Sequence, residues 1–305
     1  MAETTYAQLG NLRLAAMIEN EVRALLADMA SIRQSGALLF AGDVAGIGSK
    51  SVRLRYSDLG AKKPFSAATD GAEVTASVVT PTTVDVTVGR SGLRYDLTDL
   101  AGLSGLGNDI DAFSIAENMA ASAEARINEV IAATFGSATA SKGTSGVAMS
   151  VDDFYDAMFA LESASNMGEF YCILHPRQLS DLRDSLRSES NNALAFSAAT
   201  MEMLKIKGQG FAGSFGGVQI FKSDYVTQSG PDRVGVMMSQ GGIAYAVGTP
   251  VPLAGAGVEI RPAGTPVTIE FQRDGSKGLT EIIGHLYCGA AIAQDAQLCK
   301  LITKA

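Results

Sequence analysis

Residues 108–135 read NDIDAFSIAENMAASAEARINEVIAATF, and the rest of the chain is arranged around this segment. Its apolar residues recur at intervals of three and four, which predicts a helix with one buried face. They are Ile110, Phe113, Ala116, Ala120, Ala123, Ile127 and Ile131. Asn108 or Asp109 can cap its start, and Gly136 can form a left-handed cap at its end. At 1.5 Å per residue the helix is about 40 Å long, and the alanines in its middle let a sheet approach closely.

The composition excludes several classes of protein. The chain has 305 residues, 47% hydrophobic and 18% charged, with a net charge of -8. So few charges predict a protein that covers much of its surface with partners. The negative balance argues against tight binding of nucleic acid. Cys172, Cys288 and Cys299 form no CxxC motif, which favours reduced thiols over disulfides.

Neither an export signal nor a membrane segment is predicted. Residues 1–5 lack the basic start and apolar core of a signal peptide. Residues 234–258 carry no charge, but they include Gly241-Gly242, Pro250 and Pro252. Two strands and a loop therefore fit this segment better than a helix in lipid.

The N-terminal third combines a helix with a long β ribbon. An apolar stripe predicts a helix over residues 10–33 that ends before Ser35-Gly36. The stripe consists of Leu14, Ile18, Val22, Leu25, Met29 and Ile32. Residues 51–98 alternate between apolar and polar side chains on both sides of a polar crest, which predicts a long β excursion. A two-stranded ribbon is marginal in water, so its apolar side needs a supporting surface. That surface belongs either to the same chain or to a neighbouring subunit.

Residues 150–260 predict a mixed α/β unit. Ser150 opens a helix with a capping-box pattern, 170–174 is a short strand, and Pro176 starts the next helix. Further strands are predicted at 218–221, 234–238 and 243–247, the last two joined at Gly241-Gly242. After these, residues 267–302 return to a strand pattern with a hairpin at 274–278.

No motif in the sequence predicts catalysis. Residues 208–213 match GxGxxG, but no strand precedes them and no helix follows, so a flexible glycine loop is predicted. His175 and His285 each lie three residues from a cysteine, and on a strand such pairs point to opposite faces. Lys205 and Lys207 are interpreted as solvated charges. No catalytic, cofactor-binding or metal-binding residue is assigned, and the protein is not expected to be an enzyme.

The order of these parts resembles the major capsid proteins of tailed bacteriophages, which share the Hong Kong 97 fold. Short sequence segments support the resemblance. ENMA and AEARI within 117–127 resemble the family's long spine helix, and FYCILHPRQ at 170–178 resembles its strand-His-Pro-helix segment. GVQI within 213–223 and DAQL within 287–301 resemble its glycine-rich return strand and its closing strand.

The resemblance implies an α+β fold in five parts. An N-terminal arm with a helix takes residues 1–48, and an extended β-hairpin loop, the E-loop, takes 49–98. A peripheral domain with the spine helix covers 99–149, an axial α/β domain covers 150–262, and 263–305 completes the peripheral sheet. Because the first helix starts near residue 10, no N-terminal assembly segment that is later cut away is expected.

The resemblance also implies a function. The expected protein is a structural major capsid protein that self-assembles as hexamers and pentamers into the icosahedral head of a tailed bacteriophage. It would enclose double-stranded DNA without binding it tightly, and it would meet a portal protein and scaffolding or decoration proteins. Assembly is expected in the host cytoplasm, and the product is the virion shell, with no membrane. The alternatives are an encapsulin-like compartment shell, or a nucleotide-binding enzyme that uses the 208–213 loop.

The expected contacts between subunits fall on the ribbon. Its basic residues and one aromatic residue are the candidates: Arg53, Arg55, Lys62, Lys63, Phe65, Arg90 and Arg94.

Overall fold

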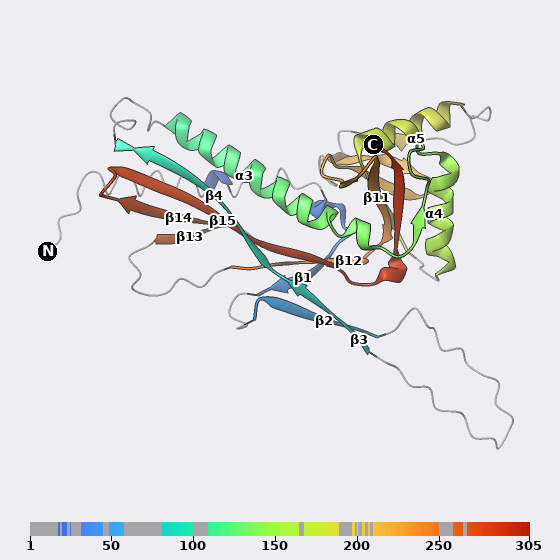
Figure 1. Cartoon of the computed structure of the whole chain (residues 1–305), viewed down its shortest axis with the longest axis horizontal. Helices are drawn as coiled ribbons and strands as arrows, with labels where there is room; N and C mark the ends of the chain where they lie inside the picture. Colours follow the sequence, from blue (N-terminus) through green and yellow to red (C-terminus); the bar gives the residue numbers. More distant parts are fainter. Residues whose placement is uncertain are drawn as a thin grey trace, which may run out of the picture.

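The computed structural model shows an elongated molecule in which a long helix lies along one sheet and a second sheet sits at one end (Figure 1). The structure describes residues 18, 20–22, 25, 32–44, 49–57, 81–99, 109–164, 168–188, 197–198, 200, 203–204, 207, 210–249, 259–264 and 267–305. Within this part of the chain the α+β class is confirmed.

A six-stranded sheet packs against the long helix α3 (Asp109–Ala132). Its strands run in the order β1-β12-β15-β14-β13, and β4 also pairs with β15. The strands are β1 (Leu39–Asp43), β4 (Gly89–Thr98), β12 (Ile243–Val247), β13 (Glu259–Gly264), β14 (Val267–Asp274) and β15 (Leu279–Ile292). Because β15 pairs antiparallel with β4, β12 and β14, it is the central strand of the sheet.

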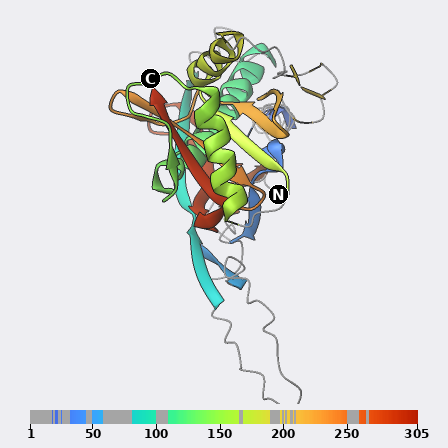
Figure 2. The same ribbon diagram turned by 90° about the vertical axis from the view of Figure 1, so that its right-hand side faces the viewer.

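The second sheet has eight strands, and the helices α4 (Val151–Ser163) and α5 (Pro176–Ser188) pack on one of its faces (Figure 2). Its strands run in the order β5-β16-β11-β6-β9-β8-β7, with β10 beside β11. They are β5 (Ser141–Lys142), β6 (Phe170–Leu174), β7 (Ser197–Ala198), β8 (Phe211–Phe215), β9 (Val218–Lys222), β10 (Gln228–Ser229), β11 (Asp232–Ser239) and β16 (Leu298–Lys304). The side chains of β6 alternate between two cores: Cys172 packs with α4 and α5, while Tyr171 and Ile173 pack in the core of α3.

The remaining elements of the described chain are a two-stranded ribbon and three short turns. β2 (Ser51–Ser57) and β3 (Pro81–Thr87) form a separate two-stranded ribbon, which projects from the lower side of the molecule in Figure 1. Three short 3-10 turns complete the described elements: η1 (Arg33–Ser35), η2 (Phe135–Ser137) and η3 (Asp295–Gln297).

The predicted apolar face of α3 is confirmed wherever the structure describes its side chains, since Ala116, Ala120, Ala123, Ile127 and Ile131 are all buried. The predicted close approach of a sheet is also found. A Cβ added to Gly284 of β15 would lie only 3.5 Å from Cε of Met119, which is itself buried. The long side chain of Met119 therefore packs against a glycine of the central strand.

The predicted cap at Gly136 is wrong. After α3 the chain tightens into the 3-10 turn η2, and Gly136 is the middle residue of that turn. Phe135, at the start of η2, is 1% exposed, and burial of its ring keeps the chain packed beside the end of α3. The N-terminal capping side chains of Asn108 and Asp109 lie outside what the structure describes.

Several other predicted features are confirmed. Ser150 caps α4 in a reciprocal capping box with Asp153, and Pro176 starts α5. The hairpin between β14 and β15 turns at Gly278, whose φ is 60°. Of the first predicted helix, the described residues Ile18 and Val22 are helical and fully buried.

The predicted α/β unit at 150–260 is wrong in one respect. The chain does turn at Gly241, with φ 87°, but β11 before the turn and β12 after it belong to different sheets. The turn is therefore a crossover and not a hairpin. At the far end of the chain, β16 returns to the eight-stranded sheet beside β11.

The predicted flexible glycine loop at 208–213 is wrong for its described half. Residues from Phe211 onward form strand β8, which pairs with β9, and Gly213 lies at a register shift with φ 142°. Since β8 leads directly into β9, no helix follows the glycines, as a phosphate-binding loop would require.

The ribbon joins the six-stranded sheet at a very close backbone crossing. β4 pairs with β15 as far as Gly89 and Cys288, and the chain then continues backward through Val88 into β3. A Cβ on Gly289 would lie 1.9 Å from the carbonyl oxygen of Thr87. Because that obstacle is backbone, no side chain can rotate to make room, and only glycine fits at position 289.

We expect Gly289→Ala to lower the free energy of unfolding by about 1–3 kcal/mol, the usual cost of extra atoms in a packed site. Urea denaturation of the unassembled protein measures this effect. Gly275→Ala is the matched control, because an added Cβ there has no atom within 4 Å. Equal stability of the two variants would contradict a tight crossing at Gly289.

Candidate functional site

Three of the seven predicted contact residues lie outside the described residues: Lys62, Lys63 and Phe65. The other four lie on β2 and β4. On β2, Arg53 forms a two-pronged ion pair with Asp85 of β3, with distances of 2.8 and 3.0 Å. Hydrogen bonding from Arg53 lowers the pKa of the Asp85 carboxyl. Arg55 is exposed and has no ion-pair partner among the described residues.

The base of the ribbon rests on its own subunit. Val86 of β3 is fully buried with Ala244 and Ala246 of β12, and Val52 and Leu54 of β2 pack against the same cluster. The apolar side of the ribbon is therefore supported at its base by the same chain and not by a neighbouring subunit. The part of the ribbon at 58–80 lies outside the described residues.

Arg90 of β4 forms a chain of hydrogen bonds with His285 and Glu270 on the sheet. Its guanidinium lies 3.2 Å from Nδ1 of His285, and Nε2 of His285 lies 3.0 Å from Glu270. A guanidinium can only donate, so Nδ1 must accept and Nε2 must carry the proton that it donates to Glu270. The geometry thus selects one neutral tautomer of a histidine that is 5% exposed.

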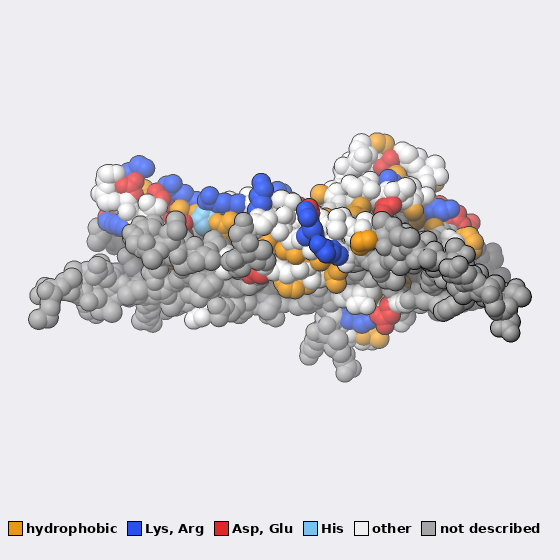
Figure 3. All heavy atoms as spheres, turned by 90° about the horizontal axis from the view of Figure 1, so that it is seen from below, with side chains coloured by type: hydrophobic (Ala, Val, Ile, Leu, Met, Phe, Trp, Pro, Cys, Tyr) orange, Lys and Arg blue, Asp and Glu red, His pale blue; other side chains and the backbone are white. Residues whose placement is uncertain are grey.

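Arg94, four residues further along β4 on the same face, also has partners in its own subunit. It bonds to Asp96 at 2.5 and 2.8 Å and to Glu281 at 2.8 Å. Beyond it, Arg273 pairs with Asp99. Hydrogen bonds from these arginines lower the pKa of Asp96 and of Asp99. Figure 3 shows Lys and Arg side chains spread along one face of the molecule with Asp and Glu side chains among them.

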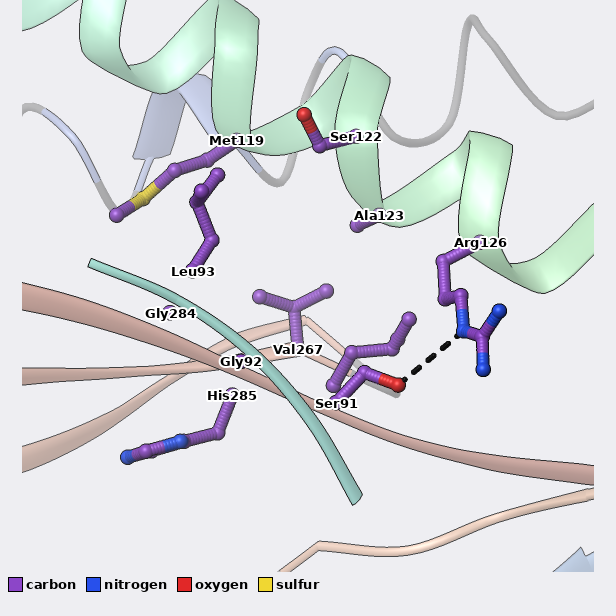
Figure 4. A pocket seen from close by; sticks show the side chains of 11 residues that line it. Ser91, Gly92, Leu93, Met119, Ser122, Ala123, Arg126, Val267, Gly284 and His285 are labelled. Atoms are coloured by element: carbon purple, nitrogen blue, oxygen red, sulfur yellow. Dashed lines mark hydrogen bonds between the residues drawn. The ribbon is translucent and has the colours of Figure 1, made fainter. Parts of the chain in front are cut away.

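A cavity of about 220 Å³ opens between α3 and the strands β4 and β15 (Figure 4). Its lining is mostly apolar and includes Leu93, Met119 and Ala123. Arg126 stands at one end, where its Nε donates to Ser91 at 3.3 Å, while the His285 side chain points away from the helix.

A buried ion pair fixes the end of the N-terminal segment to α3. Glu124 is 4% exposed and lies 2.5 Å from the guanidinium of Arg33 in η1. Gly36, directly after η1, turns the chain with φ 75° toward β1. The sequence reasoning missed this pair, although Glu124 falls four residues after Ala120 on the predicted buried face, where a lone charge signals a partner.

The three cysteines, His175 and Lys207 are buried or hydrogen-bonded within the fold. Burial raises the pKa of Cys288 and Cys299 to about 11, and it also raises the pKa of Cys172, so these free thiols are poor nucleophiles. His175 accepts a hydrogen bond from the backbone N–H of Arg177 at 3.1 Å and thereby caps α5. Lys207, interpreted as solvated, donates to Gln219 at 2.6 Å.

Membrane-spanning helices and metal clusters are both absent from the described part of the chain. No helix among these residues is both long and apolar enough to cross a membrane. Likewise, within the same ranges no three His, Cys, Asp or Glu residues gather closely enough to hold a metal ion.

Comparison with known proteins identifies relatives of the whole arrangement. A family model described as "Phage capsid protein" matches residues 81–300. The capsid structure of the cyanophage P-SCSP1u is similar, with 11% identity, a TM-score of 0.60, and coverage of 90% of this chain and 88% of that chain. A structure from Mycobacterium phage Che8 matches with 14% identity, a TM-score of 0.58 and coverage of 90% of both chains.

A third similar structure is the holo-SrpI encapsulin complex from Synechococcus elongatus PCC 7942. It shares 15% identity and a TM-score of 0.59, with coverage of 89% of this chain and 87% of that chain. No curated protein sequence matches the chain.

We expect Glu124→Ala to lower the free energy of unfolding by about 3–5 kcal/mol, because it leaves the Arg33 charge buried without its partner. Glu129→Ala is the control on the same helix, since Glu129 pairs with Arg126 at the exposed surface and such pairs contribute at most about 1 kcal/mol. Thermal or urea denaturation compares them. A similar loss of unfolding free energy in both variants would show that the buried pair stabilises the fold no more than the surface pair does.

Proposed function

Because the chain belongs to the phage capsid protein family, we propose that its copies assemble as hexamers and pentamers into the icosahedral head of a tailed bacteriophage. It is a structural capsid protein of the Hong Kong 97 type. The observation that carries the proposal is the family match over residues 81–300, which covers β3 of the ribbon, the spine helix and most strands of both sheets. Double-stranded DNA would be enclosed, and portal, scaffolding or decoration proteins would be further partners.

The surface of the subunit supports repeated contacts with other copies. Only 18% of all residues are charged. Arg53 and Arg94 are exposed but already paired within the subunit, so a neighbour can approach them without meeting bare charge. Our proposed contacts between subunits stay the seven residues Arg53, Arg55, Lys62, Lys63, Phe65, Arg90 and Arg94.

The division into five parts stays part of the proposal. In it, 1–48 is an arm, 49–98 the E-loop, 99–149 and 263–305 the peripheral domain, and 150–262 the axial domain. Two strands connect across these limits, because β12 pairs with β15 and β16 pairs with β11. The two domains of the proposal therefore share their sheets.

A compartment shell of the encapsulin kind is the second candidate function. The structural similarity to the encapsulin from Synechococcus elongatus supports it, since one fold can form both kinds of shell. The contents of purified particles separate the two candidates. Packaged DNA supports the phage head, and a protein cargo supports the compartment.

The first test of the proposal is assembly itself. The purified protein should sediment as closed shells that electron microscopy shows directly, whereas a stable small oligomer would overturn the proposal. Shortening the ribbon by removing residues 58–74 should leave a folded subunit that no longer closes into shells. The described base of the ribbon is held by its own subunit, so the deletion spares the fold. Normal particles from this variant would rule out an intersubunit role for the crest.

DNA should be held by enclosure and not by tight binding. With a net charge of -8, the subunit offers few phosphate contacts and little counterion release. Unassembled subunits should therefore leave the mobility of duplex DNA unchanged in a gel at low ionic strength. A strong shift that disappears with added salt would show that a local basic patch outweighs the net charge.

A further inference from the structure

Helix α4 presents an uncovered acidic face with one large aromatic residue in it. The exposed residues Asp152, Asp156, Phe159 and Ser163 follow one another at intervals of four, three and four, so they form one stripe. Phe159 is 68% exposed, more than any other large hydrophobic side chain in the described part of the chain. The helix contains four acidic residues and no basic residue. Asp156 lies 3.5 Å from Nζ of Lys142, but its side chain is still 66% exposed.

Helix α5 presents the opposite charge. Arg177, Arg183 and Arg187 are exposed on one side of it. Arg177 pairs with Asp181 and Arg187 with Asp184, but the two arginine side chains are still 57% and 80% exposed. The Arg187–Asp184 pair lies at the surface and is weak, so Arg187 can exchange its partner at little cost. Arg177 keeps its pairing with Asp181, whose side chain is only 8% exposed.

The two faces also match in length. Asp152 to Glu162 on α4 and Arg177 to Arg187 on α5 each span ten residues, which is about 15 Å along a helix. In Figure 1 α5 lies across the top of its domain and α4 runs down the side, so the faces are displayed in different directions. Figure 2 shows the same arrangement, with α4 in front of the sheet and α5 above it.

Both helices are rigidly attached. The capping box fixes the start of α4, and the backbone N–H of Val151 donates to Ser185 of α5 at 3.3 Å. Gln178 of α5 is fully buried and donates to Thr303 of β16 and to the carbonyl of Arg233 in β11. The two faces are therefore held in a fixed relation, as a repeating contact requires.

We propose that the acidic face of α4 in one subunit docks on the arginine face of α5 in a second copy of this chain. The proposal rests on the proposed function, because it names the contact between neighbours within a hexamer or pentamer. The exposed ring of Phe159 supplies the apolar centre, and the carboxylates of α4 meet the guanidiniums of α5 around it.

Charge selects this pairing over the alternative of two identical faces. An α4–α4 contact would bring the exposed carboxylates of two copies of Asp152, Asp156 and Glu162 together, six in all, without a base on either helix. A contact between two different faces repeats head to tail, and such contacts close into rings when the rotation allows. The arrangement therefore favours a ring over an isolated two-fold dimer.

Charge reversal in both helices tests the proposal. Asp156→Lys with Glu162→Lys on α4, or Arg183→Glu with Arg187→Glu on α5, should each reduce the yield of closed shells by about tenfold or more. Combining all four substitutions should restore most of the yield, because the pairing is then rebuilt with its signs exchanged. Lys222→Glu, an exposed change in the same domain, is the control and should assemble normally.

Phe159→Ser tests the centre of the contact without altering charge, and Tyr225→Ser, another exposed aromatic residue, is its control. Phe159→Ser should lower the shell yield while circular dichroism shows a folded subunit. Normal shells from both reversed variants, or no recovery in the fourfold variant with its fold intact, would overturn the docking proposal. If the unaltered protein forms no shells, the proposed function itself fails, and the two failures are thereby distinguished.

Discussion

The contact between α3 and β15 is the constraint on which the rest of the subunit depends. The buried face of α3 is rich in alanine, and Met119 on the same helix packs over Gly284 of β15. β15 then serves as the common partner of β4, β12 and β14. Through β4 it carries the ribbon, and through η2 and the shared core the helix also reaches the second sheet.

Local sequence patterns predicted the elements well because their causes are local. The periodicity of α3, the capping box at Ser150 and the helix start at Pro176 each depend on residues within one or two turns. Sheet membership depends on distant parts of the chain. The turn at Gly241 looks the same in sequence whether β12 returns to β11 or crosses to β15, and only burial of the whole domain decides between them.

The candidate site was less predictable, for a related reason. Alternation in the sequence placed Arg53, Arg90 and Arg94 on polar faces, but it could not show that each already has a partner. Those partners are separated by up to 195 positions, as for Arg90 and His285. Glu124 differs from these arginines, because a carboxylate inside an apolar stripe indicates a buried cation from the pattern alone, although the pattern does not name Arg33 as that cation.

Internal pairing also limits how copies of the subunit can recognise one another. Exposed arginines that already bond to Asp85 or Asp96 would gain little from a second carboxylate, since one weak surface pair replaces another. Most of the free energy of assembly must then come from apolar surface that assembly removes from water, with charge serving to select the partner face. Among the described residues Phe159 on α4 and the cavity beside Leu93 offer such surface, and they lie on different parts of the subunit. Because Arg53 and Arg94 are paired internally, the few charges that lack strong internal partners, such as those on α4, select the correct neighbour while separated apolar surfaces supply the free energy.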